Sequence, residues 1–188
     1  MAAAESNQTE TAGDACDGFS DNKTRVIVSS FIIESVQTED PNVRLEPEDL
    51  GNIPANNNDQ DIKQVVKQLI QIANELETNV ELKRLIDNVP VDSTRDVLLK
   101  VYKGVFSDGF SLGKLAVILF FASKLVLKAA IQKCRQVISS IFSTTSSFIE
   151  THVLPFIRDQ GGWESLPWQN VAAVAGVAAS AAFAFLLS

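Results

Sequence analysis

The feature that most constrains this fold is an almost unbroken apolar stretch, residues 106–129, in the middle of an otherwise acidic chain. Residues 115–122 carry no polar side chain, and a run of this length is too long for a typical strand, so it predicts a helix. At roughly 100° per residue, three lysines of this helix fall within an arc of about 80°: Lys114, Lys124 and Lys128. Such a helix is either the buried centre of an all-helical domain, with its lysines reaching the surface, or a segment destined for a membrane. We expect it to serve both roles at different times.

Length, charge and cysteine usage narrow the class of protein. The 188 residues are enough for one domain with a sizeable core and a tail. A formal net charge of -7 argues against nucleic-acid binding, and it means that apolar burial must drive any membrane engagement. Cys16 and Cys134 are too few for a disulfide framework or a metal site. Because residues 1–10 also lack the basic and apolar regions of a secretory signal, we expect a cytosolic protein.

Composition divides the chain into an arm, a helical domain and a tail. Residues 1–23 are small, polar and acidic without periodicity, so we predict a disordered arm. Residues 24–166 are predicted to form the helical domain, and its first, buried helix spans Thr24–Val36. Within this domain, residues 37–60 contain three prolines and many Asn and Asp residues, which is typical of a long flexible loop. Residues 167–188 form an apolar tail.

Two amphipathic helices are predicted between the loop and the central helix. In the first, apolar residues recur at steps of three and four and form a narrow seam: Ile62, Val65, Leu69, Ile72 and Leu76. The second follows Pro90, with Asp92 or Ser93 as its cap. An apolar seam is most often one wall of a core, but it is also the shape that docks into a groove on a partner.

The central helix and the next segment predict a helical hairpin. The turn Ser107–Gly109 offers capping groups at the start of the central helix. Residues 137–157 are again largely apolar, and the basic Lys133–Arg135 segment before them suits an exposed turn. Two adjacent apolar helices of near-spanning length indicate a hairpin that can insert into a membrane after the surrounding helices separate.

The C-terminal segment is a second strong hydrophobic signal. Residues 171–187 carry no charge and, as a helix, would extend roughly 25 Å, at the short end of what spans a bilayer. Alanine dilutes their hydrophobicity, and Gly176 and Ser180 form a small-residue pair of the kind that packs against another helix. Two interpretations stay open, a membrane anchor and a helix that closes over a groove on its own protein.

Three runs carry a family resemblance that extends from about Thr24 to the end. The central run FSDGFSLGKLAVILFFASKLVLKA, the run LIQIANEL at residues 69–76 and the run IRDQGGWE at residues 157–164 resemble the homology motifs of the Bcl-2 family of apoptosis regulators, in their Bax-like form. The resemblance implies an all-α fold, a globular bundle of about nine helices around a central hydrophobic helical hairpin. It also implies a C-terminal tail helix and a surface groove that can hold it.

The resemblance assigns roles to individual residues. The death-motif helix would contain Ile62, Val65, Leu69, Ile72, Ala73, Asn74, Glu75 and Leu76. The groove that accepts such a helix would use Gly113, Lys114, Leu115, Val117 and Phe121. The second homology motif would contain Asp159, Gly161, Gly162 and Trp163. The membrane hairpin would use Leu119, Phe120, Leu125, Val126, Ile141 and Phe142. The tail helix would use Val171, Gly176, Ser180, Phe183 and Leu187.

Two positions depart from the family pattern. Asn74 stands where the death motif usually carries Asp, and Lys114 stands where the first homology motif usually carries Arg. In the family these two charges face each other when a death-motif helix docks in a groove. Because lysine is a point donor where arginine is bidentate, we expect a looser groove contact here.

The resemblance implies a pro-apoptotic effector that changes from a soluble monomer to a membrane oligomer and permeabilises the mitochondrial outer membrane. It would be cytoplasmic at rest and mitochondrial on activation. Its partners would be the death-motif helices of other Bcl-2 family proteins, further copies of itself and the lipid of that membrane. Two alternatives stay open: a groove-bearing pro-survival relative that sequesters death-motif helices, and a tail-anchored helical adaptor.

The sequence predicts neither an enzyme nor a cofactor. His152, the single histidine, lies in an apolar segment without a nearby cysteine or serine elbow, so we expect an ordinary helix-surface residue. Gly161–Gly162 predicts a turn, because the lysine and hydroxyl residue of a phosphate-binding loop do not follow it.

Overall fold

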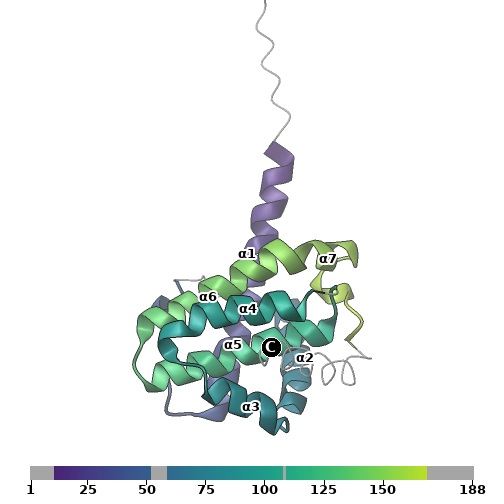
Figure 1. Ribbon diagram of the computed structural model, residues 1–188. Coiled ribbons are helices and arrows are strands. Elements are labelled where there is room, and N and C mark those ends of the chain that lie inside the picture. Colours follow the sequence, from purple (N-terminus) through teal and green to yellow (C-terminus); the bar gives the residue numbers. More distant parts are fainter. Residues whose placement is uncertain (1–10, 52–58, 108, 169–188) are drawn as a thin grey trace, which may run out of the picture.

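The computed structural model describes residues 11–51, 59–107 and 109–168, and within these ranges its regular elements are all helical (Figure 1). The α-helices are α1 (Thr11–Glu39), α2 (Gln60–Leu76), α3 (Val80–Asp87), α4 (Thr94–Val105), α5 (Leu112–Ile131), α6 (Arg135–Phe148) and α7 (Leu154–Asp159). The short elements are the 3-10 turns η1 (Pro47–Leu50), η2 (Val91–Ser93) and η4 (Trp163–Ser165), and the π-helical turn η3 (Ile149–Val153). The predicted all-α class is confirmed.

Helices α6 and α7 are one continuous helix, because η3 joins them without a break. Pro155 follows this π-helical turn, and since proline has no N–H to donate to residue i−4, it accounts for the irregular hydrogen bonding there. The described residues therefore form six helical rods rather than the expected nine or so. The predicted tail helix lies in residues 169–188, outside the described residues.

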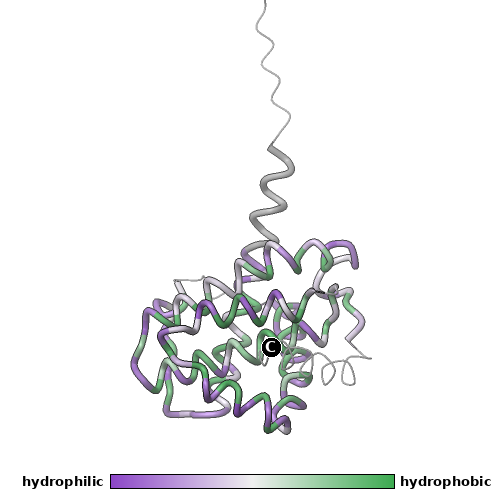
Figure 2. Tube along the Cα trace, viewed as in Figure 1, coloured by the Kyte–Doolittle hydropathy of each residue, from purple (hydrophilic) through white to green (hydrophobic). Residues whose placement is uncertain are grey.

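Helix α5 forms the centre of the bundle, and α1, α2, α3, α4 and α6 all contact it. Residues 115–119 have no exposed surface at all. Figure 2 shows hydrophobic residues along most of α5, whereas the outer turns of α3 and α6 are more hydrophilic. No helix within the described ranges is long and apolar enough to cross a membrane.

Side-chain caps determine where several helices begin. Asp59 accepts hydrogen bonds from the backbone N–H groups of Asp61 and Ile62 at the start of α2. Ser111 caps α5 by accepting from the N–H of Lys114 at 3.2 Å, so the cap lies beyond the turn Ser107–Gly109 that was expected to provide it. The difference arises because Ser111, in an extended conformation, is the last residue before the helical run.

Two other regions differ from expectation. Helix α1 begins at Thr11 rather than at Thr24, because extending an existing helix avoids the cost of nucleating one. The first part of the predicted flexible loop packs on the body, since Leu45 and Leu50 are buried and η1 contacts α6. Residues 52–58 of that loop lie outside the described residues.

A buried pair of hydroxyl groups joins α4 to α6. Tyr102 Oη and Thr145 Oγ1 lie 2.8 Å apart, and neither residue has exposed surface. Burial raises the pKa of Tyr102 above its ordinary value, and the hydrogen bond with Thr145 only partly opposes this shift. The Tyr102 ring also packs against Phe148 with centroids 5.3 Å apart. The neutral phenol therefore fixes the position of α4 on α6.

Replacing Tyr102 by Phe should lower the free energy of unfolding by about 1–2 kcal/mol, because Thr145 loses its buried partner. The double variant Tyr102→Phe/Thr145→Val should lose less than the sum of the two single variants, because it leaves no orphaned hydroxyl. Guanidinium unfolding followed by circular dichroism measures all three. Additive losses would contradict a direct interaction.

Candidate functional site

The predicted death-motif helix is α2, and its apolar seam is buried inside the bundle. Leu69 has no exposed surface, and the other seam residues are at most 7% exposed: Ile62, Val65, Ile72 and Leu76. Ala73, which was also assigned to the death-motif helix, is 5% exposed. Val66 is buried with them, so the buried face is wider than the predicted seam. Asn74 and Glu75 are exposed on the opposite face. The amphipathic pattern is therefore used internally, against α1, α5 and η4.

The predicted groove residues lie in the first half of α5. Gly113, Leu115, Val117 and Phe121 are buried, so in this state they belong to the core. Lys114 is half-buried and donates a hydrogen bond to the carbonyl oxygen of Gly109 at 2.9 Å, in the loop that precedes its own helix. The expected contact between a lysine at this position and the Asn74 amide of a docked helix stays a prediction.

Lys124 lies at the centre of an ion-pair cluster that connects α5 with the ends of α1 and α2 and with α3. Its ammonium group pairs with Glu39 at the end of α1 and with Glu77 after α2, in the second case at 2.5 Å. Lys83 of α3 adds to the cluster through Glu77, at 2.7 Å. The side chain of Lys124 is only 9% exposed, and its nitrogen lies 5.1 Å from the centre of the Phe120 ring. We call these four charged residues the Lys124 cluster.

Lys128 of α5 also contacts a neighbouring helix, at the C-terminal end of α3. Its Nζ donates to the carbonyl oxygens of Asp87 at 2.7 Å and Val89 at 2.5 Å, at and beyond the C-terminus of that helix. A cation at this position satisfies carbonyls that have no partner in the helix and interacts favourably with the helix dipole. The lysines of α5 were expected to reach the surface, but Lys124 and Lys128 instead contact the ends of neighbouring helices. A lysine in an apolar helix can do so because its long stem reaches past the adjacent turn.

The contacts within the Lys124 cluster shift the pKa of Glu77. Partial burial opposes ionisation of Glu77, but the hydrogen bonds from Lys124 and Lys83 outweigh it and hold the pKa of the carboxyl below its ordinary value. The same contact with Glu77 raises the pKa of Lys83. Both partners are therefore held in their charged forms.

The residues predicted to form the second homology motif make a tight turn that closes one end of the bundle. Gly161 and Gly162 have φ angles of 98° and 104°, which side chains other than glycine rarely adopt. This turn directs Trp163 into the core, where it is 3% exposed in an element that contacts α2. Lys23 of α1 pairs with Glu164 and fastens the turn from the other side. Asp159, predicted with this motif, is exposed at the end of α7.

The predicted hairpin residues are all buried between the two helices or against their neighbours. These are Leu119, Phe120, Leu125, Val126, Ile141 and Phe142. The turn between α5 and α6 contains Lys133 in a left-handed conformation with φ 58°, and Lys133 and Arg135 are exposed as predicted.

His152 is exposed on η3, which agrees with its interpretation as a surface residue. The predicted tail residues lie outside the described part of the chain: Val171, Gly176, Ser180, Phe183 and Leu187.

A family profile described as apoptosis regulator proteins of the Bcl-2 family matches residues 69–163, just over half of the 188 residues. The chain belongs to the Bcl-2 family. The match begins at Leu69, within the α2 seam, and ends at Trp163, so it includes the second half of the seam, all of α5 and the glycine turn.

Curated relatives place the chain close to one branch of the Bcl-2 family. It is 41% identical over 128 residues to the mouse protein named apoptosis regulator BAX. The aligned residues cover 63% of this chain and 67% of the mouse protein. The human protein of the same name matches with the same identity and coverage. The Bax-like resemblance is therefore confirmed at the level of sequence.

Solved structures match at the level of the fold. Chicken BOK aligns with a TM-score of 0.63 at 15% identity, over 79% of this chain and 94% of that one. Trichoplax adhaerens trBcl-2L2, solved bound to trBak BH3, aligns with a TM-score of 0.62 at 17% identity, over 78% and 95% of the two chains. The fold is thus shared with Bcl-2 family proteins.

Glu77 gives this Bcl-2 family chain a pH-dependent contribution to stability. Because its pKa is lower in the folded than in the unfolded chain, the contribution is present above the ordinary value of 4.5 and is lost as pH falls through the folded-state pKa. Glu77→Gln should flatten the stability profile between about pH 6 and about pH 3. With the side chain 39% exposed, solvent screening limits the effect to less than about 1 kcal/mol.

Thermal unfolding at a series of pH values measures this difference. Glu75→Gln is the matched control, because Glu75 is exposed on α2 and belongs to no ion pair among the described residues. An identical profile for the wild type and Glu77→Gln would contradict the role of the cluster.

Proposed function

We propose that this chain is a pro-apoptotic, Bax-like effector that changes from a soluble monomer to a membrane oligomer and permeabilises the mitochondrial outer membrane. The observation that carries the proposal is the complete burial of Leu69 in the α2 seam, in a chain 41% identical to BAX. A death-motif helix that is folded into its own core has no binding face available. It can act on a partner only after α2 leaves α5, and this requirement makes the resting state inactive.

The Lys124 cluster and Lys128 would act as the polar contacts that retain α2 and α3. Glu77 follows α2 directly, and α3 ends at the carbonyls that Lys128 binds, so both contacts must break when these helices move. The burial of the apolar seam stabilises the packing of α2 more than these polar contacts do. A partner helix that replaces this burial would shift the equilibrium to the open state.

The partner class is supported by a fold neighbour. Trichoplax trBcl-2L2 has been solved with trBak BH3 bound, and it shares the present fold. We infer that the activating partner is an amphipathic death-motif helix, and that a released α2 can be captured by a second copy of this chain. The α5–α6 hairpin and residues 169–188 would then engage the lipid, which moves the protein from the cytosol to the mitochondrial outer membrane. This is a regulatory role without a catalytic step.

The alternative is a pro-survival protein that sequesters death-motif helices. Asn74 supports it, because α2 lacks the acid that a death motif usually presents to a partner. Lys114, which replaces the groove arginine, weakens both functions alike, because each needs a groove. The similarity to BAX is the observation that supports the effector over this alternative.

Dye release from liposomes distinguishes the two functions. We expect the full-length protein to release dye only when a peptide of residues 59–78, which contains α2, is added. A peptide with Leu69→Glu should not act, because a carboxylate cannot be buried where leucine has no exposed surface. Placing the change in the peptide leaves the fold of the protein intact.

Absence of release, together with protection of the liposomes against a known permeabiliser, would contradict the effector function and support a pro-survival protein. Absence of both release and protection would refute both functions.

Weakening the Lys124 cluster should make activation easier. Lys124→Gln removes both ion pairs of α5 with the ends of α1 and α2, so we expect release at a severalfold lower peptide concentration. Lys67→Gln is the control, since it makes the same charge change at an exposed position of α2. Equal thresholds for Lys124→Gln and the wild type would show that the cluster does not retain α2.

A further inference from the structure

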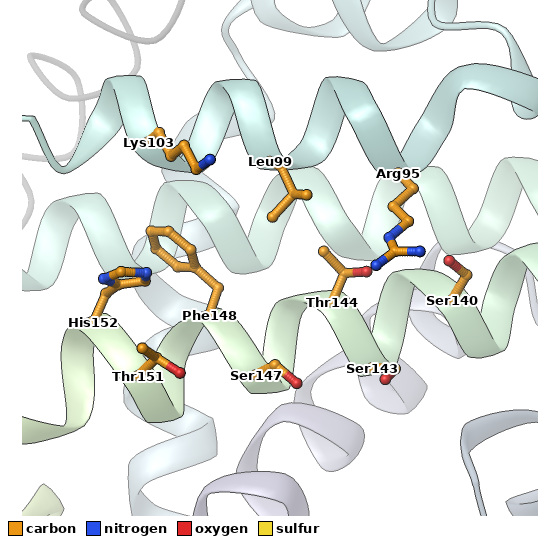
Figure 3. A pocket seen from close by; sticks show the side chains of 10 residues that line it. All are labelled: Arg95, Leu99, Lys103, Ser140, Ser143, Thr144, Ser147, Phe148, Thr151 and His152. Carbon is orange, nitrogen blue, oxygen red and sulfur yellow. The ribbon is translucent and has the colours of Figure 1, made fainter.

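A hollow of about 360 Å³, lined mostly by polar residues, lies between α4 and the helix formed by α6 and η3 (Figure 3). None of its lining residues belongs to α2 or α5, so it is separate from the seam and the predicted groove residues. Its volume falls in the range of small-molecule sites, about 300–1,000 Å³. The proposed function therefore does not use this hollow.

The hollow is basic although the chain as a whole is acidic. Arg95, Lys103 and His152 line it, and no carboxylate does. Neither Arg95 nor Lys103 forms an ion pair with another described residue, in contrast to Arg25, which pairs with Glu150 at 3.0 Å. The carboxylate of Glu150 is thus turned toward α1. Unneutralised cations in a partly enclosed polar site attract anions more strongly than isolated surface charges do.

Residues that carry hydroxyl groups line the other side of the hollow. Five serine and threonine residues of α6 and η3 line the hollow at helical spacing: Ser140, Ser143, Thr144, Ser147 and Thr151. None of these hydroxyls forms a hydrogen bond within the described part of the chain, whereas Ser29 and Ser123 bond back to their own helices. In Figure 3 the Arg95 side chain extends from α4 toward Thr144 and Ser140, and Lys103 and His152 lie at the other end.

We propose that this hollow binds a phosphate group, with Arg95 as its main anchor. A guanidinium group offers paired donors that match two phosphate oxygens, and the hydroxyls of Thr144 and Ser140 can donate to the same group. Lys103 adds a second positive charge further along the hollow. Leu99 and Phe148 supply an apolar floor, which suits an organic phosphate ester better than a free anion. The ligand class is a small phosphate ester, either a soluble compound or a lipid headgroup.

Binding of glycerol phosphate to the full-length protein, followed by amide NMR shifts, tests the proposal. We expect saturable shifts at Thr144, Ser147 and Arg95 that weaken as sodium chloride is added. Arg95→Gln should weaken binding by about tenfold, because the charge-assisted bidentate contact is lost. Lys100→Gln, an equal charge change at an exposed position of the same helix outside the hollow, should change binding by less than about twofold. Thr144→Val provides a second test that leaves the charge unchanged.

A vesicle experiment identifies the source of the phosphate. Binding to phosphatidylcholine vesicles that contain phosphatidic acid, when it depends on Arg95, supports a lipid headgroup. Binding of glycerol phosphate alone supports a soluble ligand. The proposal is overturned if the shifts do not saturate, if Arg95→Gln and Lys100→Gln weaken binding equally, or if an acidic peptide binds the hollow while both phosphate probes fail.

Discussion

The burial of α5 is the constraint on which the rest of the structure depends. This helix is apolar on nearly its whole circumference, so it can be stable in water only if other helices surround it. Five neighbours each contribute one apolar face to that purpose, and α2 is one of them. A helix that covers α5 cannot leave without exposing apolar surface. The same packing that stabilises the fold therefore makes the release of α2 costly, and it links any such release to a new partner or a lipid environment.

Two lysines of α5 specify how the neighbouring helices are positioned on this apolar core. Lys124 and Lys128 contact the ends of other helices rather than solvent, and neither contact is made in the middle of a helix. Apolar burial alone would tolerate small sliding movements between helices, because it does not depend on orientation. Charged hydrogen bonds to defined carboxylate and carbonyl oxygens specify one register. Helices α2 and α3 are thus positioned by polar contacts and stabilised by apolar ones.

Much of the fold could be predicted from local sequence patterns, and the long-range polar contacts could not. The three-and-four spacing predicts α2 and its buried face, and the continuous apolar run predicts α5. Helix α3 is not predicted, because its eight residues bury only Leu82 and Ile86 and give no clear period. The Lys124 cluster is missed for another reason. Its members are far apart in sequence, and nothing in the sequence around a glutamate indicates which lysine it will pair with.

The π-helical turn explains how the C-terminal half of the domain keeps its buried face. Thr145, Ile149, Val153 and Ile157 have no exposed surface and are spaced by four residues. In a regular α-helix each such step would rotate the side chain by about 40°, and three steps would carry Ile157 away from the core. The wider turn of η3 corrects this drift. The orientation of α7, and with it the placement of Trp163 against α2, therefore depends on the number of residues in this turn as much as on their identity. A deletion of one residue there would rotate the following segment by about 100° and turn a buried face toward solvent.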